Sequence, residues 1–223
     1  MNLPIIPILL EDAQILVITK PPGLVINRAE SVKEPTLQDW MEAQQWYGKW
    51  QTDVYADEDV ALYHSRSGVV HRLDKDTSGV MVLAKNPASL LELMRQFHDR
   101  ETQKTYCALV HGKFSTQSGT VILPLARNVG NRERFTVDPE GRESETEYTV
   151  LEFFPHAPLY LGQKKTKSYQ GFSLIELKPK TGRTHQIRVH MAYIKHPLVG
   201  DIKYVGRKRS RVDGEWCPRQ FLH

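Results

Sequence analysis

Short strand-like runs that follow one another across brief turns constrain the fold of this chain most strongly. Residues 14–20, 79–85 and 104–112 are apolar or alternating runs bounded by proline or glycine. Three more strand candidates cover 118–125, 144–154 and 171–180, whereas helical spacing appears only in 36–46, 88–101 and 183–196. Strands that outnumber helices and follow one another directly favour the α+β class, with a mixed, largely antiparallel sheet and flanking helices.

Two boundaries in this pattern affect the candidate site. The stretch 47–67 is polar, acidic and irregular, so we expect a long loop there. Pro179–Gly182 breaks the last strand, so we expect a helix to begin near Arg183. A cation at a helix start is disfavoured by the helix dipole, which indicates an anion near Arg183.

The distribution of charge separates the two parts of the chain. Residues 1–62 carry 4 Lys/Arg and 10 Asp/Glu, whereas residues 63–223 carry 26 and 16. The basic excess gathers in "KPKTGRTHQIRVH" and in "KYVGRKRSR". A basic part of this size indicates a polyanionic partner, although a solvated basic face would have the same composition.

The sequence disfavours two classes of protein, membrane-spanning proteins and proteins stabilised by disulfides. The early apolar run "LPIIPILL" contains two prolines and is too short to span a bilayer. Cys107 and Cys217, the two cysteines, form neither a disulfide framework nor a zinc set. They indicate reduced thiols, and hence a cytoplasmic protein.

The stretch "VVHRLDKDTSGVMVLAK" (69–85) places two acids between a loop and a buried strand. A carboxylate such as Asp74 on a loop anchored by a rigid element is well placed for chemistry. From the residues alone, an Asx-turn with surface charges fits equally well. A magnesium site formed by Asp74, Asp76 and His71 is a third interpretation, although no third clustered acid follows.

Four ordered stretches resemble the RluA-type pseudouridine synthases. The segment "HRLDKDTSGVMVLAK" is similar to the catalytic motif of that family, and "EDAQILVITKPPGLVIN" to its opening strand and Lys-Pro-x-Gly turn. The stretch "KTYCALVHG" resembles its tyrosine-bearing strand, and "KPKTGRTHQIRVHMAYIKHPLVGDIKY" its arginine-bearing segment. The resemblance implies the pseudouridine synthase fold with a central active-site cleft.

The resemblance also implies an activity, the isomerisation of uridine to pseudouridine within ribosomal or transfer RNA. Asp74 matches the essential carboxylate, which either attacks C1′ or removes a proton from C2′. Arg183 matches the position that pairs with this acid, and a guanidinium keeps a carboxylate ionised. Tyr106 matches the active-site tyrosine, whose ring can stack on uracil and whose hydroxyl can approach C5.

A uridine in structured RNA must leave its stack to reach such a site. Arg72 matches the family position that fills the resulting gap. Five other cations are candidates for salt-dependent contacts with the RNA backbone: Lys75, Lys104, Lys180, Arg188 and Lys203. We expect His71, His185 and His190 to be structural.

No metal or other cofactor is expected, because the implied reaction rearranges bonds within one substrate. A monomer without an obligate protein partner is the expected state. Two rival functions stay open: a structured-RNA-binding module without activity, and a metal-dependent phosphotransferase or nuclease using Asp74 and Asp76. A dispensable Asp74 would indicate the first, and chelator-sensitive activity the second.

We expect one catalytic domain over residues 1–223. The family pattern begins near Glu11, so an accessory N-terminal RNA-binding domain is not expected, and the loops Ser31–Ser67 and Pro155–Gln170 are candidates for RNA targeting. The ending "RQFLH" resembles the start of a closing segment that continues through further strands in the family. We therefore expect the last strands to be missing and a sheet edge to be uncovered.

Overall fold

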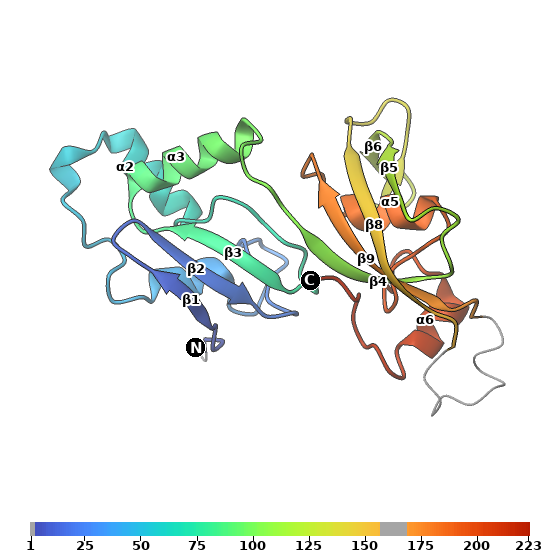
Figure 1. Cartoon of the computed structure of the whole chain (residues 1–223). Helices are drawn as coiled ribbons and strands as arrows, with labels where there is room; N and C mark the ends of the chain where they lie inside the picture. The colour runs from blue at the N-terminus through green and yellow to red at the C-terminus, as the bar shows by residue number, and fades with distance from the viewer. Residues whose placement is uncertain (1–2, 157–168) are drawn as a thin grey trace. The chain divides into compact units, whose positions relative to one another are not determined.

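A computed structural model describes residues 3–156 and 169–223 of the chain (Figure 1). The fold divides into two compact units, Met1–Thr102 and Gln103–His223. Each unit has its own sheet and its own hydrophobic core. The expected single catalytic domain and its central cleft stay predictions.

The first unit is built on a three-stranded antiparallel sheet of β1 (Ile8–Glu11), β2 (Ile15–Lys20) and β3 (Gly79–Ala84), in that order. Side chains of β2 alternate between the half-buried and the buried face, as expected for a strand with one face on the core. Leu16, Ile18 and Lys20 occupy the buried face, and none of them has exposed surface. The last of these buried positions on β2 is thus occupied by a lysine, Lys20.

Helices of this unit begin at side chains that cap them. Helix α1 (Leu37–Glu42) has a capping box, in which Thr36 and Asp39 each accept a backbone N–H of the other. Helix α3 (Pro87–His98) begins after Asn86, whose side chain accepts from the N–H of Ser89, and has proline in its first turn. The predicted helices at 36–46 and 88–101 are thus confirmed, although α1 ends at Glu42.

The prediction of a long loop over 47–67 is wrong. A short 3-10 helix, η1 (Thr52–Val54), and helix α2 (Asp57–Arg66) lie within it. Three acids in the first turn and His64 and Arg66 in the last turn complement the helix dipole. Tyr63 is the one buried side chain of α2, so the apolar repeat that reveals most helices is missing from its sequence.

The second unit contains a four-stranded antiparallel sheet in the order β4 (Tyr106–His111), β9 (Phe172–Pro179), β8 (Glu145–Phe154) and β5 (Ser118–Ile122). A separate hairpin pairs β6 (Leu125–Arg127) with β7 (Phe135–Val137).

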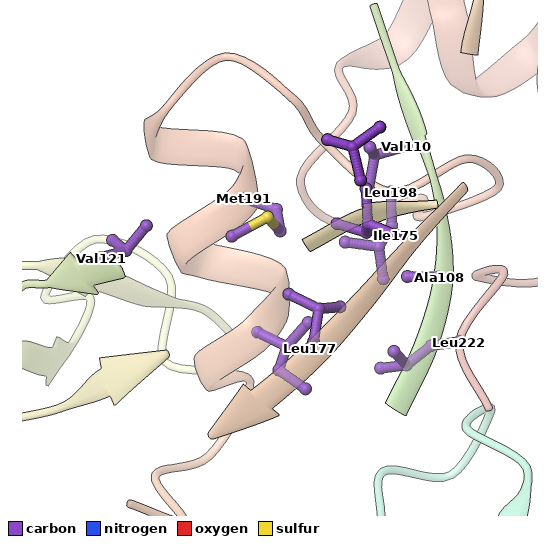
Figure 2. Close-up of a cluster of buried hydrophobic side chains, with 10 residues drawn as sticks. Ala108, Val110, Val121, Ile175, Leu177, Met191, Leu198 and Leu222 are labelled. Carbon is purple, nitrogen blue, oxygen red and sulfur yellow. The ribbon is translucent and has the colours of Figure 1, made fainter. Parts of the chain in front are cut away.

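Helix α5 (Gln186–Tyr193) packs against one face of the four-stranded sheet. Figure 2 shows Met191 of this helix among side chains of the same buried cluster as Leu177 and Ile175 from β9. Ala108 and Val110 of β4 belong to the same cluster. The buried side chains of α5 therefore hold the segment before it against the sheet.

The edge of β4 that faces away from β9 is covered along its length. Residues 197–199 pair with its second half, where His111 N–H donates to Pro197 O and Val199 N–H to Leu109 O. Residues 221–223 pair with its first half through two hydrogen bonds between Cys107 and His223. The uncovered edge that we expected is thus not found at β4.

The α+β class with antiparallel sheets and flanking helices is confirmed, with the strands divided among three sheets. Most of the predicted loop Pro155–Gln170 lies outside the described residues. Among the residues that the structure describes, no helix is long and apolar enough to cross a bilayer.

Candidate active site

Asp74 begins a tight turn that leads into β3. The N–H of Thr77 donates to the carbonyl of Asp74 at 3.1 Å, which closes a four-residue turn with aspartate at its favoured first position. Asp74 is half-buried, Thr77 and Ser78 are buried, and Arg72 and Lys75 are exposed. The carboxylate thus projects from a turn whose far end is part of the core.

Lys20 anchors this turn from the end of β2. Its buried Nζ donates to the carbonyl oxygens of Lys75 at 2.8 Å and Thr77 at 2.9 Å. It also donates to Pro21 O at 2.8 Å, and the N–H of Gly23 donates to Lys75 O at 2.8 Å. The ammonium group and the Lys-Pro-Pro-Gly turn therefore fix the backbone on both sides of Asp76.

His71 fastens the other end of the segment to β3. Its Nε2 accepts from the N–H of Val82 at 3.2 Å, so this nitrogen carries no proton. The ring stacks on Phe97 of α3 with 4.6 Å between ring centroids. The structural role that we expected for His71 is consistent with these contacts, and the segment 71–79 is held at both ends.

Tyr106 and the Arg183 segment lie at the same end of the sheet in the second unit. Tyr106 begins β4 and pairs with Leu177, two residues before β9 ends at Pro179. The chain then turns through residues 180–185 into α5. Antiparallel pairing thus places Tyr106 beside the end of the strand that leads to Arg183, and Asp74 belongs to the other unit.

Gln186 organises the turn that carries Arg183. Its buried Oε1 accepts from the Thr181 hydroxyl at 2.6 Å and from the N–H of Arg183 at 3.0 Å. Its Nε2 donates to Glu145 O at 2.8 Å and to the Thr146 hydroxyl at 3.0 Å. One amide therefore joins the turn to the start of β8, a role that sequence reasoning missed.

Arg183 precedes the helix instead of starting it. Helix α5 begins at Gln186, and His185 before it has a left-handed backbone (φ 58°). The half-buried Arg183 donates from Nε to the carbonyl of Glu143 at 3.1 Å. The expected boundary was three residues early, so the argument from the helix dipole does not apply to Arg183.

Arg188 is a structural residue in this fold, and our prediction of an RNA contact for it is wrong. The side chain is buried and donates to both carboxylate oxygens of Asp201, from Nε at 2.7 Å and from Nη2 at 3.0 Å. Its guanidinium also lies 5.1 Å from the ring centroid of Tyr204. A buried guanidinium that is bound in this way cannot reach a phosphate.

The remaining predicted RNA-binding lysines lie nearer the surface. Lys180 forms an ion pair with Glu147 and Lys203 with Glu133, at 2.9 and 3.1 Å, and Lys104 is half-buried. Ion pairs of this exposure are weak, so both side chains can exchange a carboxylate for a phosphate. These lysines and Lys75 stay predicted contacts.

His185 and His190 have protein partners, as expected for structural histidines. His185 Nδ1 lies 2.8 Å from the Tyr204 hydroxyl. His190 has no exposed surface and lies between Ser144 and Thr146 at 2.9 and 3.0 Å. Burial lowers the pKa of the His190 imidazole.

Metal ligands are not gathered in the part of the chain that the structure describes. Within residues 3–156 and 169–223, no three His, Cys, Asp or Glu side chains are placed to hold one ion. The magnesium interpretation of Asp74, Asp76 and His71 therefore finds no support from the geometry.

Comparison with known proteins identifies the family of this chain. The chain belongs to the RNA pseudouridylate synthase family, whose model matches residues 14–193. That range includes Lys20, Asp74, Tyr106, Arg183 and Gln186. The RluA-type resemblance is thereby confirmed.

Several relatives carry related names. An uncharacterized RNA pseudouridine synthase of Aquifex aeolicus is 41% identical over 96% of this chain and 60% of its own length. The ribosomal large subunit pseudouridine synthase D of Borreliella burgdorferi is 37% identical over 96% of this chain and 57% of its own length. The chain thus spans about 60% of the length of these relatives.

Solved structures of two human proteins share the fold. RNA Pseudouridylate Synthase Domain Containing 1 aligns with a TM-score of 0.69 and 27% identity, over 100% of this chain and 79% of the human chain. Domain Containing 4 aligns with a TM-score of 0.56 and 24% identity, over 91% and 70%. The second likeness concerns the fold alone.

Proposed function

We propose that this chain isomerises uridine to pseudouridine in ribosomal RNA. The observation that carries the proposal is the Asp74 turn, which lies within the residues that the family model matches and is held by the buried ammonium group of Lys20. A relative that aligns with 96% of this chain is named for the ribosomal large subunit. That name favours ribosomal over transfer RNA as the substrate.

Asp74 is the proposed catalytic carboxylate. Attack on C1′ and removal of the C2′ proton both require this group to be ionised and fixed in one orientation. A half-buried position on an anchored turn supports such a role, because a reacting group must be held within a fraction of an ångström.

Arg183 and Tyr106 are proposed to complete the reaction centre. Arg183 would pair with the Asp74 carboxylate, and Tyr106 would stack on the uracil and approach C5. Changing Arg183 to alanine should then reduce kcat strongly with little change in RNA affinity. Equal losses of kcat and affinity would instead identify Arg183 as a phosphate contact.

Arg72 is proposed to fill the gap that the flipped uridine leaves. Its exposure on the segment before Asp74 supports this role. Arg72→Ala should therefore slow modification of a folded RNA much more than modification of a single strand. The same loss on both substrates would contradict a gap-filling role. Lys75, Lys104, Lys180 and Lys203 are proposed to contact phosphates around the site.

The proposal is tested by measuring product. Unmodified ribosomal and transfer RNA are incubated separately with the protein, with and without a chelator, and pseudouridine is quantified after digestion to nucleosides. Chelator-insensitive product in ribosomal RNA is the expected result. Binding without product would favour an RNA-binding module, and product in transfer RNA alone would reassign the substrate. A monomeric state and a cytoplasmic location complete the proposal.

A further inference from the structure

Helix α6 (Arg207–Asp213) presents three cations on one face. Arg207, Lys208 and Arg211 are exposed, whereas Asp213 at its end is buried. At 3.6 residues per turn, positions 207, 208 and 211 fall within about 100° of one another around the axis. We call these three side chains the α6 basic face.

Among the described residues, the α6 basic face forms no ion pair with a carboxylate, whereas four other cations of this unit do. Lys178 pairs with Glu176, and Lys180 with Glu147. Arg188 and Lys203 also pair with acids. The positive charge of α6 is therefore not neutralised by the described part of the chain.

This placement of charge destabilises the helix itself. Arg207 and Lys208 lie in the first turn, where the helix dipole disfavours cations. Arg211 follows them at spacings of four and three residues, at which like charges repel. A sequence that opposes local stability in two ways indicates that the charges serve an external anion.

The helix is nevertheless firmly mounted. The buried Asp213 carboxylate accepts from the Tyr169 hydroxyl at 2.6 Å and from the N–H of Gly200 at 3.1 Å. Its Oδ2 also lies 2.9 Å from Nε2 of the buried His111. The basic face is thus presented from a fixed position, which limits the entropy that an anion must remove on binding.

That position lies far from the predicted catalytic end of the sheet. His111 ends β4 and Tyr106 begins it, so α6 is attached at the opposite end of this strand, as Figure 1 also shows. Five residue steps of a strand span about 17 Å. An anion on the basic face and a uracil at Tyr106 would therefore be separated by several nucleotides.

We propose that the α6 basic face binds the phosphate backbone of the RNA substrate away from the target uridine. The proposal rests on the proposed function for the identity of the polyanion. Helix α6 lies beyond residues 14–193, so this contact is not carried over from the family match. An anionic membrane fits less well, since Val212 is the one apolar residue among the seven of α6.

The test replaces all three cations by glutamine in the full chain (Arg207→Gln, Lys208→Gln and Arg211→Gln). A control with the same loss of charge changes the exposed cations Arg100, Lys178 and Lys195 to glutamine. RNA affinity is measured at several salt concentrations on a long ribosomal RNA fragment and on a short stem-loop that contains the target. Thermal unfolding of each variant verifies that the fold is intact.

The expected result is weaker binding of the long fragment, with the slope of log affinity against log salt smaller by roughly 2 to 3, about one for each phosphate that the variant no longer neutralises. The short stem-loop should bind both variants alike, and kcat at saturating RNA should equal that of the wild type. Wild-type affinity and slope on the long fragment, or the same loss in the control, would overturn the proposal.

Binding of the wild type and of the α6 variant to vesicles of phosphatidylserine and phosphatidylcholine is measured as well, to test a membrane as the partner. Vesicle binding that the α6 variant loses while its RNA binding is unchanged would assign the face to a membrane and overturn the proposal. Because affinity is measured without turnover, the absence of pseudouridine formation would refute the proposed function and leave this test intact.

Discussion

Lys20 donates a hydrogen bond from its fully buried ammonium group to the carbonyl oxygen of Thr77, 57 residues further along the chain, at 2.9 Å. The same group donates to Lys75 O at 2.8 Å. Both carbonyls belong to the turn that starts at Asp74. The orientation of the proposed catalytic carboxylate therefore depends on a residue at the end of a different strand.

Replacing Lys20 by methionine should reduce kcat more than it changes KM for RNA. The substitution keeps an unbranched side chain but removes the donor to the turn. The buried carbonyl of Thr77 then loses its hydrogen bond from Nζ at a cost of about 1–3 kcal/mol, whereas Lys75 O keeps the N–H of Gly23. Urea unfolding and steady-state kinetics measure the two effects. Lys178→Met, at an exposed position, is the control, and a Lys20→Met enzyme with wild-type kcat would contradict the anchoring role.

The hydrogen bonds of Gln186 lead to a similar prediction for the turn of the second unit that carries Arg183. Gln186→Leu removes both the acceptor for the N–H of Arg183 and the donor to Glu145 O, so the turn that carries Arg183 should lose its fixed shape. We expect kcat to fall with little change in RNA affinity. Gln186→Glu keeps the acceptor oxygen and should retain more activity than Gln186→Leu; the reverse order would refute the positioning role.

Arg188 should contribute to folding and not to RNA recognition. Arg188→Met leaves the buried Asp201 carboxylate unpaired, which should destabilise the protein by about 3–5 kcal/mol. The double variant Arg188→Met/Asp201→Leu should recover part of that loss in urea unfolding. A folded Arg188→Met protein whose salt dependence of RNA binding is weaker than that of the wild type would restore the original prediction of a phosphate contact.

His190 should make stability fall as the pH is lowered. Ser144 donates its hydroxyl to Leu123 O, so its oxygen can accept from Nε2–H of His190. Gln186 donates to the Thr146 hydroxyl, which can in turn donate to Nδ1. Burial favours the neutral ring and lowers the pKa of His190 in the fold.

The sign of the effect follows from this lowered pKa. Below about pH 6.5 the unfolded chain binds a proton at His190 that the folded chain does not, so the free energy of unfolding decreases until the folded pKa is reached. Urea unfolding between about pH 7.5 and pH 5.5 measures this decrease. His190→Gln should show a smaller decrease, and an unchanged pH dependence in that variant would contradict the assignment.

The sequence predicted those elements that have a clear repeat or cap. The apolar run 14–20, closed by Pro21-Pro22-Gly23, and the Asn86-Pro87 start of α3 were sufficient to place β2 and that helix. Helix α2 could not be found in this way, because Tyr63 is its one buried residue and its stability depends on packing against distant side chains.

Sequence motifs indicated the proposed catalytic residues, but they indicated much less about the residues that hold them in place. Asp74, Tyr106 and Arg183 lie in motifs, whereas Gln186 acts through partners 3 to 41 residues away that no local pattern reveals. Lys20 did give a signal, since it continues the buried alternation of Leu16 and Ile18. Arg188 was misassigned because its partner Asp201 lies 13 residues further on.

Tritium release from ribosomal RNA labelled at uracil C5 tests the central claim most directly. Wild type, Asp74→Asn and the matched variant Asp76→Asn are compared with and without a chelator. We predict chelator-insensitive release that Asp74→Asn abolishes and Asp76→Asn largely retains. Release from Asp74→Asn at the wild-type rate, or release that the chelator abolishes, would contradict the account.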